Sequence, residues 1–77
     1  MGFYLQNNKI LKKFEDRSDA MRFAVRVTCL TSPRTEIREE DGSVRYVYGW
    51  RKSERRTVLE YAKCDSLYLP LKETENG

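Results

Sequence analysis

The sequence predicts a small α+β domain in which one main helix packs on an antiparallel sheet of about four strands, forming two layers. Three observations indicate this class: a helical apolar pattern over about residues 17–30, the hairpin dipeptide Asp41-Gly42 between alternating segments, and short alternating segments near both ends. The 77 residues suffice for one domain. We assign it to residues 1–72, followed by an acidic tail, 73–77, that is expected to fray.

The N-terminal segment is expected to form a hairpin. Residues 3–6 alternate in the manner of a strand, and Asn7-Asn8 follows as a turn because Asn tolerates left-handed backbone angles. Residues 9–14 then return as a second strand.

The main helix is predicted from apolar residues that recur at helical spacing. They are Ala20, Phe23, Ala24, Val27 and Leu30. Asp16 or Ser18 can cap the helix, since a side-chain oxygen of either residue can accept a hydrogen bond from the unpaired backbone N–H groups of the first turn. Pro33 keeps Ser32 away from helical angles, so the helix must end before it.

The central hairpin carries the strongest local signal. Asp41-Gly42 predicts a two-residue type I′ turn, which places Glu39 opposite Val44, Ile37 opposite Tyr46 and Thr35 opposite Tyr48. The apolar face then contains Ile37, Val44, Tyr46, Tyr48 and Trp50, and the charged face contains Glu36, Arg38, Glu40, Arg45 and Arg51. We expect the helix to lie on the apolar face, because an antiparallel sheet of this kind keeps one face wet.

The segment after Trp50 allows two interpretations. Ser53 can cap a helix over 54–63, whereas Thr57, Leu59 and Tyr61 alternate like a further strand. Residue propensities favour the second helix slightly. A last strand is expected at Leu67, Leu69 and Leu71, with Pro70 restricting it to a sheet edge.

The composition argues against most catalytic chemistry. The chain has no histidine, which removes the commonest general base and every His-containing zinc site. Cys29 and Cys64 are too few for a four-cysteine site, and we interpret them as small buried apolar residues, with one disulfide between them as the alternative. No cofactor and no metal are therefore predicted. An enzyme using only the carboxylates Glu36, Glu39, Glu40 and Asp41 is the last of three hypotheses.

The N-terminus lacks the basic and apolar regions of a secretory leader, and no apolar run approaches the roughly 20 residues of a membrane span. We therefore expect a cytoplasmic protein without a membrane partner.

The first functional hypothesis is a protein-binding module that acts stoichiometrically, as an inhibitor or adaptor. One strand combines Tyr48 and Trp50 with Arg45 and Arg51, and Tyr, Trp and Arg are enriched in interface hot spots. Alternatively, Tyr48 and Trp50 are core residues beneath the helix and not part of an interface. Chains of this size and composition occur among phage and mobile-element accessory proteins, including anti-CRISPR inhibitors of bacterial defence nucleases. An edge strand that pairs with a second copy would give a homodimer.

The alternative hypothesis is a nucleic-acid-binding domain. Arg51, Lys52, Arg55 and Arg56 form a basic cluster that can neutralise phosphates, with Trp50 or Tyr48 stacking on bases. Glu54 interrupts this cluster, and the net charge of +3 is low for such a function.

Overall fold

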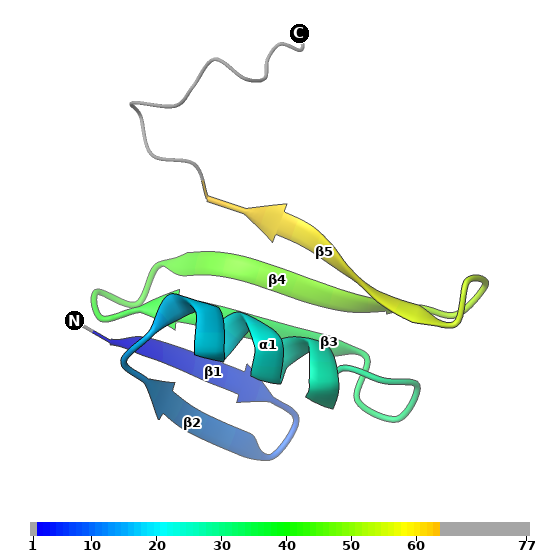
Figure 1. Ribbon diagram of the computed structural model, residues 1–77, viewed down its shortest axis with the longest axis horizontal. Helices are drawn as coiled ribbons and strands as arrows, with labels where there is room; N and C mark the ends of the chain where they lie inside the picture. Colours follow the sequence, from blue (N-terminus) through cyan, green and yellow to red (C-terminus); the bar gives the residue numbers. More distant parts are fainter. Residues whose placement is uncertain (1, 64–77) are drawn as a thin grey trace, which may run out of the picture.

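The computed structural model describes residues 2–63, which form a five-stranded antiparallel sheet with one helix on one face (Figure 1). The strands are β1 (Phe3–Asn7), β2 (Ile10–Phe14), β3 (Arg34–Glu39), β4 (Val44–Arg51) and β5 (Arg56–Ala62), and the helix is α1 (Arg17–Val27). Their order across the sheet is β2-β1-β3-β4-β5. The predicted α+β class is confirmed, with five strands instead of about four.

The predicted N-terminal hairpin forms, but its turn lies at residues 8–9 and not at Asn7-Asn8, because Asn7 is the last residue of β1. Phe3 pairs with Phe14 and Asn7 pairs with Ile10, and Asn8 takes a left-handed φ of 53° in the turn between the strands. On its other side, β1 pairs with β3, so that Leu5 lies opposite Ile37 at the centre of the sheet.

The helix ends at Val27, three residues before the predicted end. Thr28 leaves helical angles, with φ −81° and ψ 119°, while its backbone N–H still donates to the carbonyl of Ala24. Cys29 and Ser32 then close a short bridge. Leu30 therefore lies outside the helix and is 61% exposed, so its predicted place on the apolar face was wrong. Asp16 occupies the N-cap position without a side-chain capping bond.

The turn of the central hairpin differs from the prediction. The Gly42 N–H donates to the Glu39 carbonyl, and only Gly42 has a positive φ, of 88°, whereas a type I′ turn needs two such residues. Ile37 pairs with Tyr46 and Thr35 with Tyr48, as predicted.

Nearer the turn, the register of this hairpin shifts. Arg38 lies opposite Val44, and Arg45 is the extra residue of a β-bulge, so the predicted pairing of Glu39 with Val44 was wrong. Val44 consequently lies on the face of Arg38 and not on the apolar face.

The segment predicted to favour a second helix over 54–63 is strand β5. It pairs with β4 from Arg51 opposite Arg56 to Tyr46 opposite Ala62. Helix propensities differ by at most about 0.7 kcal/mol for ordinary residues, which long-range pairing can outweigh. The predicted last strand at 67–71, the tail at 73–77 and any contact of Cys64 lie outside the described residues.

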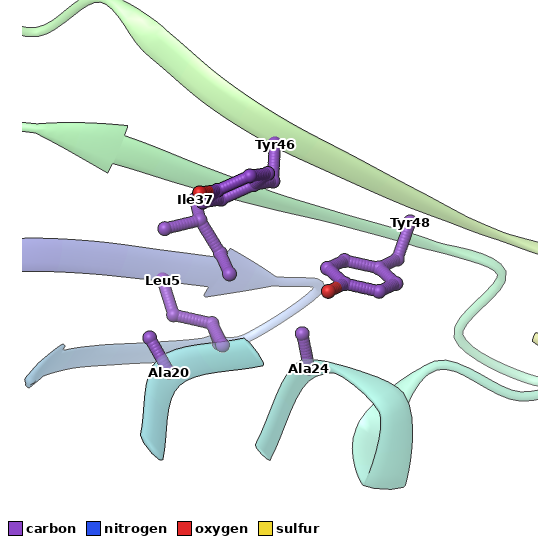
Figure 2. Packing of buried hydrophobic residues seen from close by; sticks show 6 residues of the cluster. All are labelled: Leu5, Ala20, Ala24, Ile37, Tyr46 and Tyr48. Carbon is purple, nitrogen blue, oxygen red and sulfur yellow. The ribbon is translucent and has the colours of Figure 1, made fainter. Parts of the chain in front are cut away.

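The core lies between α1 and the centre of the sheet, where Leu5, Ile37, Tyr46 and Tyr48 point toward the helix (Figure 2). Ala20 and Ala24 are fully buried, and their small side chains allow the helix to approach the sheet closely. The helix contacts β1, β2 and β3, so that β5 extends beyond the layer it covers (Figure 1).

Candidate interaction surface

Two of the seven predicted site residues lie apart from the others. Tyr48 is only 5% exposed and belongs to the core (Figure 2). Burial is the main cause that raises the pKa of its phenol, and the electrostatic interaction with Tyr46 adds to it. Arg45 lies at the opposite end of β4, where it pairs with Glu39 at 2.9 Å and covers the Tyr46 ring at 5.6 Å. Neither shares a surface with the basic cluster.

The other five predicted residues come together where β4 turns into β5. They are Trp50, Arg51, Lys52, Arg55 and Arg56. The tight turn is closed by backbone bonds from Glu54 to Arg51 and from Arg55 to Lys52, and Arg55 has a left-handed φ of 53°. Residues 51–56, which we call the basic turn, hold four bases and one acid.

Glu54 neutralises part of the basic turn. It forms ion pairs with Arg51 at 3.1 Å and with Arg56 at 2.6 Å. Hydrogen bonds from Arg51 and then Arg56 lower the pKa of the Glu54 carboxyl. Arg51 and Arg56 lie directly opposite each other, and this shared carboxylate offsets their repulsion. Within residues 2–63, Lys52 and Arg55 form no ion pair, so the positive charge of the turn is concentrated on them.

Strand β5 forms the sheet edge that continues from this turn. Among the described strands it neighbours only β4. Leu59 lies opposite Tyr48 on the helix side and is 45% exposed, whereas Tyr61 lies opposite Val47 on the other face and is 49% exposed. Apolar contact area is therefore available on both faces of one edge strand.

A β-bulge at Glu60 shapes this edge. Tyr48 pairs with Leu59 and Val47 with Tyr61, which leaves Glu60 as the extra residue. Its carboxylate lies over Gly49 of the neighbouring strand, where a Cβ would come within 2.1 Å of Glu60 Oε2. The absence of a side chain at Gly49 thus lets the Glu60 charge fold inward over β4, away from the outer edge of β5.

The beginning of the edge is fastened to the loop that follows α1. Thr57 Oγ1 donates to the Thr28 carbonyl at 2.8 Å, and the Trp50 N–H donates to the Pro33 carbonyl at 2.9 Å. The half-buried residue Trp50 lies opposite Thr57 in the pairing of β4 with β5. These bonds hold the first half of β5 in a defined position relative to the helix.

The carboxylates considered for catalysis divide between two places. Glu36 lies between Arg34 and Arg38, whose hydrogen bonds lower its pKa, with Arg34 the larger cause. Glu39, Glu40 and Asp41 line a cavity of about 620 Å³ beside the start of α1. There Glu39 is paired with Arg45, and hydrogen bonds from Ser43 lower the pKa of Asp41. The lowered pKa values of Glu36 and Asp41 are typical of ionised carboxylates that accept hydrogen bonds. A carboxyl that acts as a catalytic acid requires a raised pKa.

Comparison of the chain with protein-family models, curated proteins and solved structures found no match. Within residues 2–63 no helix is long and apolar enough to cross a membrane, and no group of three or more potential ligand side chains is placed to hold a metal ion.

The β5 edge was not among the predicted site residues, because a helix was slightly favoured over the strand alternative for this segment. The alternation of Thr57, Leu59 and Tyr61 was the signal that could have revealed it.

Proposed function

We propose that this chain is a protein-binding module that accepts an extended segment of a partner along the β5 edge. The observation that carries the proposal is the position of β5 at the end of the sheet order, with Leu59 and Tyr61 half-exposed on its two faces. In strand addition, main-chain hydrogen bonds provide affinity and alternate side chains provide specificity. Binding of this kind needs no catalytic group and suits a stoichiometric inhibitor or adaptor.

The β5 edge suits strand addition better than the other edge of the sheet. Lys12 of β2 lies 5.4 Å from the Phe14 ring and Lys13 lies 5.7 Å from the Tyr4 ring, so two successive positions of that strand carry charge. Charged residues on an edge, especially lysines, oppose pairing with another chain. On β5, the consecutive positions Thr57, Val58 and Leu59 carry no charge.

A display library of short random peptides, selected on the full chain, tests this proposal. Peptides that bind should shift the backbone amide NMR signals of β5 and its neighbours. Leu59→Asp should weaken their binding by about tenfold or more, which corresponds to about 1.4 kcal/mol. Val25→Asp is the matched control, because Val25 is similarly exposed, at 49%, but lies on the helix. Amide shifts confined to another surface, or equal binding by Leu59→Asp, would contradict the proposal.

A second candidate function is nucleic-acid binding at the basic turn. It is favoured by Lys52 and Arg55, which lack an ion pair in the described part of the chain, and by the half-exposed Trp50 nearby. This binding would weaken steeply with salt and would be insensitive to Leu59→Asp. Labelled single-stranded and duplex oligonucleotides, titrated at two salt concentrations, distinguish it from strand addition.

The same strand addition could join two copies of this chain, with β5 of one copy pairing with β5 of the other to give a homodimer. Sedimentation of the wild-type chain and Leu59→Asp over a range of concentrations measures it, because a dimer joined along β5 should dissociate in the variant.

A further inference from the structure

The charge distribution along β5 indicates which partner segment fits the edge. The strand begins at Arg56, the last residue of the basic turn, and its only acid, Glu60, has its carboxylate folded over Gly49. The outer edge therefore presents positive charge at one end and apolar residues in the middle.

We infer that the partner segment is an extended acidic peptide, antiparallel to β5, with an apolar residue opposite Leu59 and carboxylates four and five positions C-terminal to that residue. This inference rests on the proposed strand addition and specifies its partner.

The spacing follows from strand geometry. Leu59 lies three positions after Arg56, which is a distance of about 10 Å at about 3.3 Å per residue. An antiparallel partner runs in the opposite direction to β5. The partner residue that lies three positions C-terminal to the one opposite Leu59 is therefore opposite Arg56. The next two positions run alongside Arg55 and the rest of the basic turn, where Lys52 and Arg55 have no carboxylate partner among residues 2–63.

The direction follows from the rest of the sheet. Every neighbouring pair of strands in it is antiparallel. Antiparallel pairing is also slightly more stable per residue than parallel pairing.

The bulge at Glu60 sets the length of the pairing. A bulge disrupts the ladder locally, so the uninterrupted stretch that β5 offers to a partner strand runs from Arg56 to Leu59. A short pairing region gives few main-chain bonds, and charge complementarity at the basic turn then makes a larger contribution to partner choice.

A peptide is favoured over a nucleic acid as the ligand of this surface. Glu54 already occupies Arg51 and Arg56, Tyr48 is buried, and a row of main-chain groups in register matches a peptide backbone. A nucleic acid that uses only Lys52 and Arg55 would gain few phosphate contacts.

The test uses three synthetic peptides and isothermal titration calorimetry with the full chain. The first peptide has an alternating apolar segment followed by three glutamates, the second has the same residues in reverse order, and the third has glutamine in place of glutamate. We expect the first to bind about tenfold or more tightly than the others at low salt. The difference should shrink at 0.5 M salt, where the screening length is well below about 10 Å.

Two double variants locate the charge effect. Lys52→Ser with Arg55→Asn should remove the preference for the first peptide, and Asn is chosen because it tolerates the left-handed angles of Arg55. Lys9→Ser with Arg26→Ser removes the same charge from other exposed positions and should leave the preference unchanged.

Each contrary outcome has a distinct meaning. If the glutamate and glutamine peptides bind equally and Leu59→Asp abolishes both, the acidic preference is wrong while strand addition at β5 stands. If the reversed peptide binds best, the antiparallel direction is wrong. If no peptide binds, and the display library also yields none, both the inference and the proposed function fail. If oligonucleotides bind through Lys52 and Arg55 regardless of Leu59→Asp, the surface is a nucleic-acid site.

Discussion

Three buried polar residues connect the end of α1 to the sheet. Asn7 Nδ2 donates to Thr35 Oγ1 at 2.6 Å and lies 3.3–3.4 Å from the carbonyls of Val27, Ser32 and Arg34. Thr35 Oγ1 also hydrogen-bonds Thr28 Oγ1, and Thr28 in turn bonds the Ala24 carbonyl. This network fixes the loop that holds the beginning of β5.

Thr35→Val should test the network, because it keeps the side-chain shape and removes the hydroxyl. We expect a loss of about 1–3 kcal/mol in the free energy of unfolding, since Asn7 and Thr28 would lose a buried partner. Urea unfolding measures this loss. Thr31→Val, at an exposed site in the same loop, is the control and should change stability by less than about 0.5 kcal/mol. Equal effects of the two changes would show that the buried hydroxyl is not important.

Gly42 is the glycine whose backbone angle matters most, since its φ of 88° is unfavourable for other residues. No atom beyond its chain neighbours lies within 4 Å of an added Cβ, so backbone strain is the only obstacle to a side chain there. Gly42→Val should therefore lower stability by roughly 1–2 kcal/mol. Gly42→Asn should lower it less, because Asn tolerates positive φ. Thermal unfolding of both variants makes the comparison, and an equal loss in both would contradict this explanation.

Among the elements, α1 is held by a few small and aromatic contacts. Phe23 packs against Phe14 of β2 with ring centroids 5.4 Å apart, and both rings remain half-exposed. Lys12 lies over both rings, at 5.4 Å and 5.9 Å. The helix therefore anchors the N-terminal hairpin through this aromatic pair.

Phe23→Ala should lower the free energy of unfolding by about 2–3 kcal/mol. The value lies below the roughly 3–5 kcal/mol of a fully buried phenylalanine because this ring is half-exposed. Val25→Ala, on the exposed side of the same helix, should stay within about 0.5 kcal/mol of wild type. Chemical unfolding followed by far-UV circular dichroism measures both. A change below about 1 kcal/mol for Phe23→Ala would mean that the aromatic pair does not anchor the hairpin.

The conformation of β5 is determined more by its pairing with β4 than by the intrinsic propensities of its own residues. Arg, Leu, Glu and Ala favour helix by tenths of a kcal/mol each, but pairing with β4 and the contact of Thr57 with the Thr28 carbonyl are available only to a strand. The same pairing leaves one side of β5 as the edge on which the proposed function depends.

For the whole molecule, the face of the sheet opposite α1 is held partly by charge. Arg34 and Arg38 both bond Glu36, at 2.9 Å and 2.7 Å, and lower its pKa below the ordinary 4.5. A carboxyl with a lowered folded-state pKa stabilises the fold above its unfolded-state pKa. That stabilisation is lost as the pH falls through the lowered folded-state value.

Stability should therefore decline as the pH falls below about 4.5, with Glu36, Asp41 and Glu54 all contributing in the same direction. Glu36→Gln should lower stability at neutral pH and reduce the decline below pH 4.5, because one of the ionisations linked to folding is removed. Urea midpoints measured from pH 7 to pH 3 check both effects. An identical decline in wild type and Glu36→Gln would show that this ion-pair triad does not contribute.

Local patterns in the sequence predicted the N-terminal hairpin, the start of α1, and the pairings of Ile37 with Tyr46 and of Thr35 with Tyr48. These features depend on spacing and on angles that single residues prefer, which are visible in the sequence. The basic cluster was recognised for the same reason, since its residues are neighbours along the chain, but its turn was not predicted, because Ser53 was interpreted as the cap of a helix.

Other features depended on contacts between distant residues. The bulge at Arg45 moves Val44 to the other face, the core takes up Tyr48, and β4 holds residues 56–62 as a strand. Gly49 and Glu60 lie eleven positions apart, and only the packed sheet brings the Glu60 carboxylate over the glycine. Local preferences of a few tenths of a kcal/mol determine turns and helix starts, but pairing and burial contribute more, and they decide which strand lies at the end of the sheet formed by residues 2–63.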